Sequence, residues 1–119
     1  KSILEGKPID VYNFGRMKRD FTYVDDIVAG VLSALDHNHP YEIFNLGNCH
    51  PESLNRFIST IETALGKKAK KRLRPLQPGD VPATWADIKK STRLLGFRPT
   101  TDLKTGVGHF VTWYRSYYL

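Results

Sequence analysis

A short stretch of the sequence, RMKRDFTYVDDI at residues 16–27, combines residue types that can bind a phosphorylated ligand. Three cations come directly before an acidic and aromatic segment in which a helical pattern begins: Arg16, Lys18 and Arg19. An arginine guanidinium is a planar fork of donors that matches phosphate oxygens, and a helix N-terminus adds favourable partial positive charge. The stretch therefore predicts a seat for a diphosphate. The simpler alternative is an Arg19 that only pairs with Asp20 or Asp25.

Three further side chains can complete a nucleotide site. Tyr12 ends an expected strand and can lay its ring beside a base. Asp80 lies in a Pro-Gly-Asp turn, where its carboxylate can accept hydrogen bonds from both vicinal hydroxyls of a ribose. Gln77 can donate and accept, which suits a hydroxyl or the edge of a phosphate. A structural alternative stays open, because Asp80 and Asp20 can also simply hold turns.

The chain has no convincing catalytic, cofactor-binding or metal-binding motif. No set of glycines has the G-x-G-x-x-G or G-x-x-G-x-x-G spacing of a dinucleotide pyrophosphate loop. No tyrosine is followed four residues later by a lysine. His37 and His39 have no third ligand nearby, which favours a solvated loop over a metal site. The sequence thus predicts binding groups without a catalyst, a cofactor site or a metal.

Composition limits the class of protein and its surroundings. The 119 residues fit one domain, and the net charge of +6 favours anionic partners. Cys49 is the only cysteine, which excludes an intrachain disulfide and agrees with a reducing compartment. No apolar run approaches the roughly 20 residues of a membrane span, and KSILEGKPID has no signal-peptide core. We therefore expect a soluble, cytoplasmic chain without a membrane partner.

Hydrophobic spacing predicts an α/β chain in which strands and helices alternate. Strands are expected at residues 8–12 and 41–46, together with an exposed strand inside the basic run 67–74, KKAKKRLR. Helices are expected at residues 25–36, from Pro51 to Leu65, after Asp87 and from about Asp102. The pattern leaves open whether the strands form one sheet or two.

Local signals predict the ends of several helices. KSILEG is typical of the last turn of a helix, with Gly6 in the left-handed position. Because this helix lacks a start, we expect the chain to begin partway through a larger fold. Thr22 to Asp25 has the spacing of a capping box for the next helix. The apolar and aromatic stripe of the last helix, from Leu103 to Tyr118, is expected in the core.

Five segments together resemble a known family: KPIDVYNFG, RDFTYVDDIVAGV, YEIFNLGN, LQPGDVPATWAD and LLGFRPTTDLKTGVGHFVTWYRSYY. Over nearly its whole length the chain is similar to the C-terminal part of NAD-dependent sugar-nucleotide epimerases and dehydratases. These enzymes are extended short-chain dehydrogenase/reductase proteins. The pair VYNFG and QPGDVPATWAD most resembles the UDP-glucuronate 4-epimerases of capsule and lipopolysaccharide synthesis.

The resemblance implies that residues 1–119 form an α/β substrate-binding lobe, without the Rossmann core and inactive alone. The missing N-terminal part would bind NAD and carry a Thr/Ser-Tyr-Lys catalytic set. The parent would be a homodimer that converts UDP-glucuronate to UDP-galacturonate. By matching positions, Arg19 would contact the pyrophosphate, Tyr12 would lie beside the uracil and Asp80 would bind the ribose. Gln77 stands where some family members have an arginine, so its role is the least defined.

Other functions remain compatible with the sequence. The chain could belong to another nucleotide-sugar dehydratase, decarboxylase or reductase, because the residues that separate these enzymes lie outside it. It could also be a basic nucleic-acid-binding module that uses residues 67–74, or a stand-alone interaction domain. We favour the UDP-sugar hypothesis, with no nucleic-acid partner, because the aromatics nearest the basic run, Phe57 and Trp85, are expected to be buried or distant.

Overall fold

The computed structural model describes residues 1–119 as a mixed α/β chain, which confirms the predicted fold class. The helices are α1 (Ser2–Glu5), α2 (Val24–Asp36), α3 (Leu54–Leu65), α4 (Lys89–Leu95) and α5 (Leu103–Tyr118). The strands are β1 (Pro8–Val11), β2 (Lys18–Arg19), β3 (Glu52–Ser53) and β4 (Lys70–Leu73). A 3-10 turn, η1 (Tyr12–Gly15), follows β1 directly.

The strands form two separate two-stranded sheets. β1 runs parallel to β4, with Pro8 opposite Lys70, and β2 runs antiparallel to β3, with Arg19 opposite Glu52. The main chain at residues 82–84 also lies along β2. The Lys18 N–H donates to the carbonyl oxygen at residue 82 over 2.8 Å, and the N–H at residue 84 donates to the Lys18 carbonyl over 3.2 Å. Residues far apart in the sequence therefore meet at β2.

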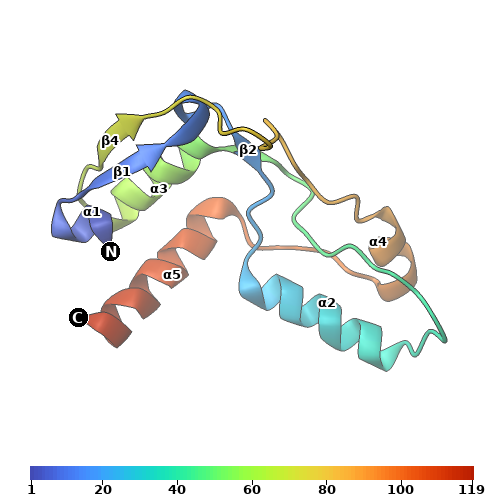
Figure 1. The fold of residues 1–119 in the computed structure, drawn as a ribbon. Helices are drawn as coiled ribbons and strands as arrows, with labels where there is room; N and C mark the ends of the chain where they lie inside the picture. Colours follow the sequence, from blue (N-terminus) through green and yellow to red (C-terminus); the bar gives the residue numbers. More distant parts are fainter.

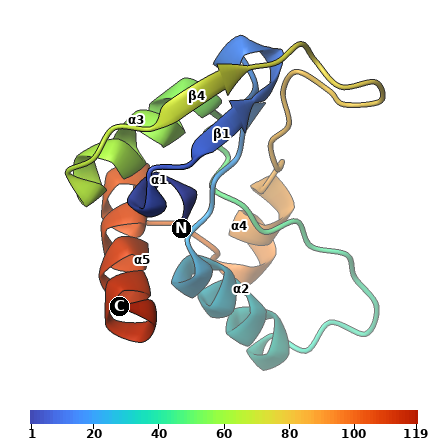
Figure 2. The same ribbon diagram turned by 60° about the vertical axis from the view of Figure 1, so that its left-hand side comes forward.

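The helices divide the molecule into two groups (Figures 1 and 2). α1, β1, β4 and α3 gather on one side, with α5 packed along α3, and α2 packs with α4 on the other side. The buried apolar side chains form a small core: Ile3, Val11, Met17, Ile58, Leu95, Phe97, Val107 and Val111. The segment between β1 and α2 is one of the connections between the two groups, and it carries the predicted site residue Arg19.

The chain leaves much of its apolar surface exposed. Its accessible surface is 8210 Å², whereas a folded monomer of this mass exposes roughly 6,600 Å². One face of α2 contributes a row of exposed apolar side chains: Val24, Val28, Val31, Leu32 and Leu35. Residues 1–119 therefore do not bury all of their own apolar faces.

The apolar and aromatic stripe of α5 was predicted to be core, and this prediction is only partly confirmed: two of its six residues are buried, two are intermediate and two are exposed. Val107 and Val111 are buried against the rest of the chain, but Phe110 and Tyr118 are exposed. α5 packs mainly on α3, so the rest of its surface is only partly covered by other segments of this chain.

The structure confirms some of the other local predictions and contradicts two of them, the strand at residues 41–46 and the start of a helix at Pro51. Gly6 takes the left-handed conformation after α1, as expected, with φ 70°, and the last helix begins after Asp102, whose side chain accepts the Thr105 N–H as its cap. Residues 41–46 form no strand, because no other strand lies beside them to pair with. Pro51 lies outside α3, which begins at Leu54 with Ser53 as its cap.

The capping box predicted for α2 is also wrong. Tyr23 occupies the cap position and its side chain makes no capping hydrogen bond. Thr22 instead donates to the Asp20 carbonyl and accepts from the Asn48 N–H.

Within this chain, no helix is both long enough and apolar enough to cross a bilayer.

Candidate functional site

The turn between β1 and β2 orients the basic segment. Asn13 and Phe14 are left-handed, with φ of 47° and 53°, and Gly15 follows at φ 80°. A Cβ at Gly15 would lie 2.0 Å from the Asn55 side-chain oxygen, so only glycine fits this turn without a shift. The Phe14 N–H donates to the carbonyl of Arg74 over 3.1 Å, which ties the turn to the end of β4. The chain therefore reverses tightly and places β2 beside residues 82–84.

Arg19 and Asp80 meet directly at this place. A guanidinium nitrogen of Arg19 lies 2.7 Å from Oδ1 of Asp80, and the other donates to the Lys18 carbonyl over 2.8 Å. The side chains are 30% and 35% exposed. The Asp80 carboxylate is fixed by its own turn, because Oδ1 also accepts the Val81 N–H and the Asp80 N–H donates to the Gln77 carbonyl. Two groups separated by 61 positions thus form one half-exposed ion pair.

The pair keeps unused hydrogen-bonding capacity. A guanidinium has five N–H groups, and two of those on Arg19 are engaged within the chain, which leaves three for a ligand. Oδ2 of Asp80 makes no hydrogen bond within the chain. A diphosphate could compete with the carboxylate for Arg19, while a hydroxyl donates to Asp80. This combination suits a ligand that carries both phosphate and vicinal hydroxyl groups.

The other two predicted site residues are placed less closely. Gln77 is exposed and belongs to the same turn as Asp80. Tyr12 is half-buried at the start of η1 and forms no side-chain hydrogen bond with Arg19, Gln77 or Asp80. The main pockets of this chain are lined by other residues. The four side chains therefore do not enclose a ligand by themselves.

The residues after Arg19 hold distant segments together, a role that the sequence prediction missed. The Asp20 carboxylate accepts three backbone N–H groups, from Cys49, His50 and Ala86. Phe21 stacks on Phe57 of α3, with ring centroids 4.0 Å apart. The only available signal was an aspartate between an arginine and an aromatic residue, which is also compatible with an ordinary turn.

Two buried carboxylates do similar work elsewhere. Asp26 accepts the N–H groups of Thr100 and Thr101. Burial raises the pKa of Asp26, but these hydrogen bonds outweigh burial and hold the pKa below its usual value. Glu62 accepts the Ala69 N–H and pairs with Lys68, and these contacts lower its pKa against the opposing effect of burial. Both groups join a helix to a segment that follows it in the sequence.

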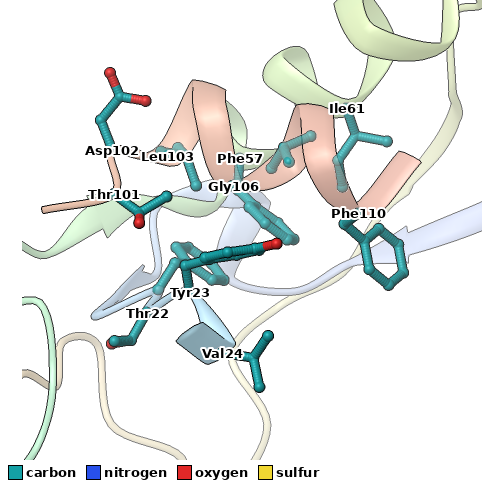
Figure 3. A pocket seen from close by; sticks show the side chains of 12 residues that line it. Thr22, Tyr23, Val24, Phe57, Ile61, Thr101, Asp102, Leu103, Gly106 and Phe110 are labelled. Atoms are coloured by element: carbon teal, nitrogen blue, oxygen red, sulfur yellow. The ribbon is translucent and has the colours of Figure 1, made fainter. Parts of the chain in front are cut away.

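The most apolar hollow lies elsewhere, between the start of α2, α3 and α5. It measures about 350 Å³, and Figure 3 shows the rings of Tyr23, Phe57 and Phe110 around it. The only charged residue in its lining is Asp102, whose carboxylate is engaged as the cap of α5. An anionic ligand would find no cation there, so this hollow does not fit a phosphate group.

Four of the six cations in the basic run 67–74 pair with two carboxylates, so the run keeps a net positive charge. Lys68 and Lys71 pair with Glu62, and Arg72 and Arg74 pair with Asp10. Paired cations are less available to phosphate groups.

No cluster of three His, Cys, Asp or Glu side chains in the chain could hold a metal ion.

Comparisons with known proteins bear on the family. The model of the NAD dependent epimerase/dehydratase family matches residues 1–47. An uncharacterized protein of Methanocaldococcus jannaschii is 51% identical over 96% of this chain, and UDP-glucuronate 4-epimerase 4 of Arabidopsis thaliana is 44% identical over 99% of it. The chain belongs to the NAD-dependent epimerase/dehydratase family.

A solved structure shows the same fold. The UDP-glucuronic acid 4-epimerase of Bacillus cereus, in complex with UDP-glucuronic acid and NAD, matches 98% of the chain described here, with a TM-score of 0.89 and 34% sequence identity. The chain spans only part of each of these proteins: 35% of the Methanocaldococcus protein, 31% of the Arabidopsis epimerase and 38% of the Bacillus enzyme.

Proposed function

We propose that this chain is the UDP-binding C-terminal part of an NAD-dependent nucleotide-sugar 4-epimerase that converts UDP-glucuronate to UDP-galacturonate. The observation that carries the proposal is the Arg19–Asp80 pair, half-exposed and 2.7 Å apart. It occurs in a chain 44% identical to the matching part of a plant UDP-glucuronate 4-epimerase. The pair offers donors for phosphate next to an acceptor for hydroxyl groups, which is the combination that a uridine diphosphate requires.

The chain's own residues bind and orient the nucleotide. Arg19 turns from Asp80 toward the diphosphate, and Asp80 accepts the ribose hydroxyls that replace the arginine as its partner. Tyr12, half-buried after β1, supplies a ring beside the uracil, and exposed Gln77 reaches the rim of the phosphates. Tight binding of UDP combined with weak binding of the sugar lets a 4-keto sugar rotate between two hydride transfers, so that the second hydride reaches its other face.

The rest of the enzyme supplies the chemistry. NAD accepts and returns a hydride, and it is held by a Rossmann domain that this chain does not include. That domain covers the apolar face of α2 and closes the second wall of the UDP cleft. The row of exposed apolar side chains on α2 supports this arrangement. Residues 1–119 are inactive alone. A homodimeric parent, a cytoplasmic location and a role in capsule or lipopolysaccharide synthesis remain predictions from the resemblance.

Kinetics of an Arg19→Ala variant of the complete epimerase test the proposal. We expect the KM for UDP-glucuronate to rise about tenfold or more, since a hydrogen bond to a charged group contributes about 1.5–3 kcal/mol. Arg93→Ala is the matched control, because Arg93 is an exposed arginine in the last turn of α4 and should leave KM unchanged. An unchanged KM in a folded Arg19→Ala enzyme would contradict the proposal.

A further inference from the structure

Asp20 follows Arg19 directly, and its side chain connects the Arg19 segment to the segment that follows Asp80. Its Oδ2 accepts the Cys49 N–H and the Ala86 N–H, each over 3.0 Å, and its Oδ1 accepts the His50 N–H over 3.4 Å. Cys49 is left-handed, with φ 54°. Successive N–H groups around a left-handed residue form a concave seat for an anion, and here the anion is the Asp20 carboxylate. The contact joins three separate parts of the chain.

Both neighbours of Arg19, Lys18 and Asp20, are hydrogen-bonded to the segment at residues 82–86. On one side of Arg19, the main chain of Lys18 is hydrogen-bonded to residues 82 and 84. On the other side, the Asp20 side chain is bonded to the N–H of Ala86. Residues 18–20 and 82–86 are therefore fixed to each other at both neighbours of Arg19. Asp80 lies just before the second segment, so these ties also set the separation between the guanidinium and the Asp80 carboxylate.

Gly47 packs closely against both Asp20 and Ala86. A Cβ at Gly47 would lie 2.8 Å from Oδ2 of Asp20 and 2.6 Å from Cβ of Ala86. Both contacts are shorter than real Cβ contacts, so glycine is required for the approach of the three segments. The fit indicates that the spacing between the Arg19 segment and the Asp80 segment is set by this cluster.

We propose that Asp20 is a positioning residue for the UDP site, which holds the segments of Arg19 and Asp80 at the spacing that lets both grip one nucleotide. This inference rests on the proposed function and deepens it. Asp20 does not touch the ligand. Its carboxylate acts through the backbone amides of residues 49, 50 and 86.

The test compares Asp20→Asn with Asp26→Asn in the complete epimerase. Asp26 is a matched control, because its carboxylate also accepts backbone N–H groups from a distant segment but does so at residues 100 and 101, away from the Arg19–Asp80 pair. In Asp20→Asn, one amide NH₂ faces backbone donors where a carboxylate oxygen accepted them. The readouts are the Kd for UDP by calorimetry, the KM and kcat for UDP-glucuronate, and the melting temperature.

We expect both variants to lower the melting temperature, but only Asp20→Asn to weaken UDP binding. The Kd and KM should rise about tenfold with kcat nearly unchanged, as for the loss of one well-placed charged contact. If Asp20→Asn does not fold, Gly47→Ala forces Asp20 and Ala86 apart without removing a charge and should raise the Kd in the same way.

The outcomes separate the inference from the function. A wild-type epimerase that does not bind UDP overturns both. If the wild-type enzyme binds UDP and a less stable Asp20→Asn binds it equally well, only the positioning role is overturned. An equal rise of Kd in Asp26→Asn would also overturn it, because the effect would then be a general loss of stability.

Discussion

Truncating Leu32 on α2 should affect the complete epimerase far more than its exposure in this chain suggests. Leu32 is 55% exposed here, in a row with other apolar side chains of α2. The accessible surface of 8210 Å² exceeds the expected value by about 1,600 Å², about twice the roughly 800 Å² that one partner buries in a standard protein–protein interface. If the Rossmann domain proposed above covers this face, Leu32 becomes a core residue in the complete protein.

The magnitude follows from what is lost. A Leu→Ala change at an exposed position usually shifts stability by less than about 0.5 kcal/mol, whereas the same change in a core costs roughly 2–5 kcal/mol. We therefore expect Leu32→Ala to lower the unfolding free energy of the complete epimerase by about 2–4 kcal/mol. The measurement is urea denaturation followed by fluorescence.

Leu73 provides the matched control. It is also a leucine and is 57% exposed, but it lies on β4 between Arg72 and Arg74 and not in an apolar row. Leu73→Ala should change stability by no more than about 0.5 kcal/mol. Equal small effects of Leu32→Ala and Leu73→Ala would refute the idea that the rest of the enzyme covers α2.

Two further predictions concern stability. The pKa of Asp26 is lowered on folding, because its backbone hydrogen bonds outweigh the effect of burial, so its contribution is present above the unfolded pKa of about 4 and is lost as pH falls through the folded pKa. Asp26→Asn should therefore lower the melting temperature at pH 7 and flatten its decline below about pH 4, and an unaltered acid limb would contradict this. Gly15→Ala should cost more than Gly66→Ala, although both positions have positive φ, because only Gly15 has a side chain, that of Asn55, at 2.0 Å from the added Cβ. The left-handed backbone alone accounts for about 1–2 kcal/mol at each, so equal losses in urea denaturation would show that Asn55 simply moves aside.

The helix ends of this chain were readable because they depend on a few adjacent residues. Gly6, Gly66 and Gly96 all take the left-handed conformation that ends a helix, and Asp102 caps α5 with its own side chain. Each signal is complete within one turn of chain, so the sequence carries it without help from the tertiary fold.

Features that depend on distant partners were not readable. Residues 41–46 have the composition of a strand but no neighbouring strand in this chain, and Phe110 has core character but is 53% exposed here. Thr22 fits a capping box but instead bonds to Asn48, brought near by the fold. The sequence likewise named Arg19 and Asp80 as site candidates, but their direct ion pair follows only from the three-dimensional path of the chain.

The most direct test of the central claim is a crystal structure of the complete epimerase with UDP. We predict that the 2.7 Å contact between Arg19 and Asp80 opens, with the guanidinium on the diphosphate and the carboxylate on the ribose hydroxyls. UDP bound elsewhere, with Arg19 and Asp80 still paired to each other and touching no ligand atom, would contradict it.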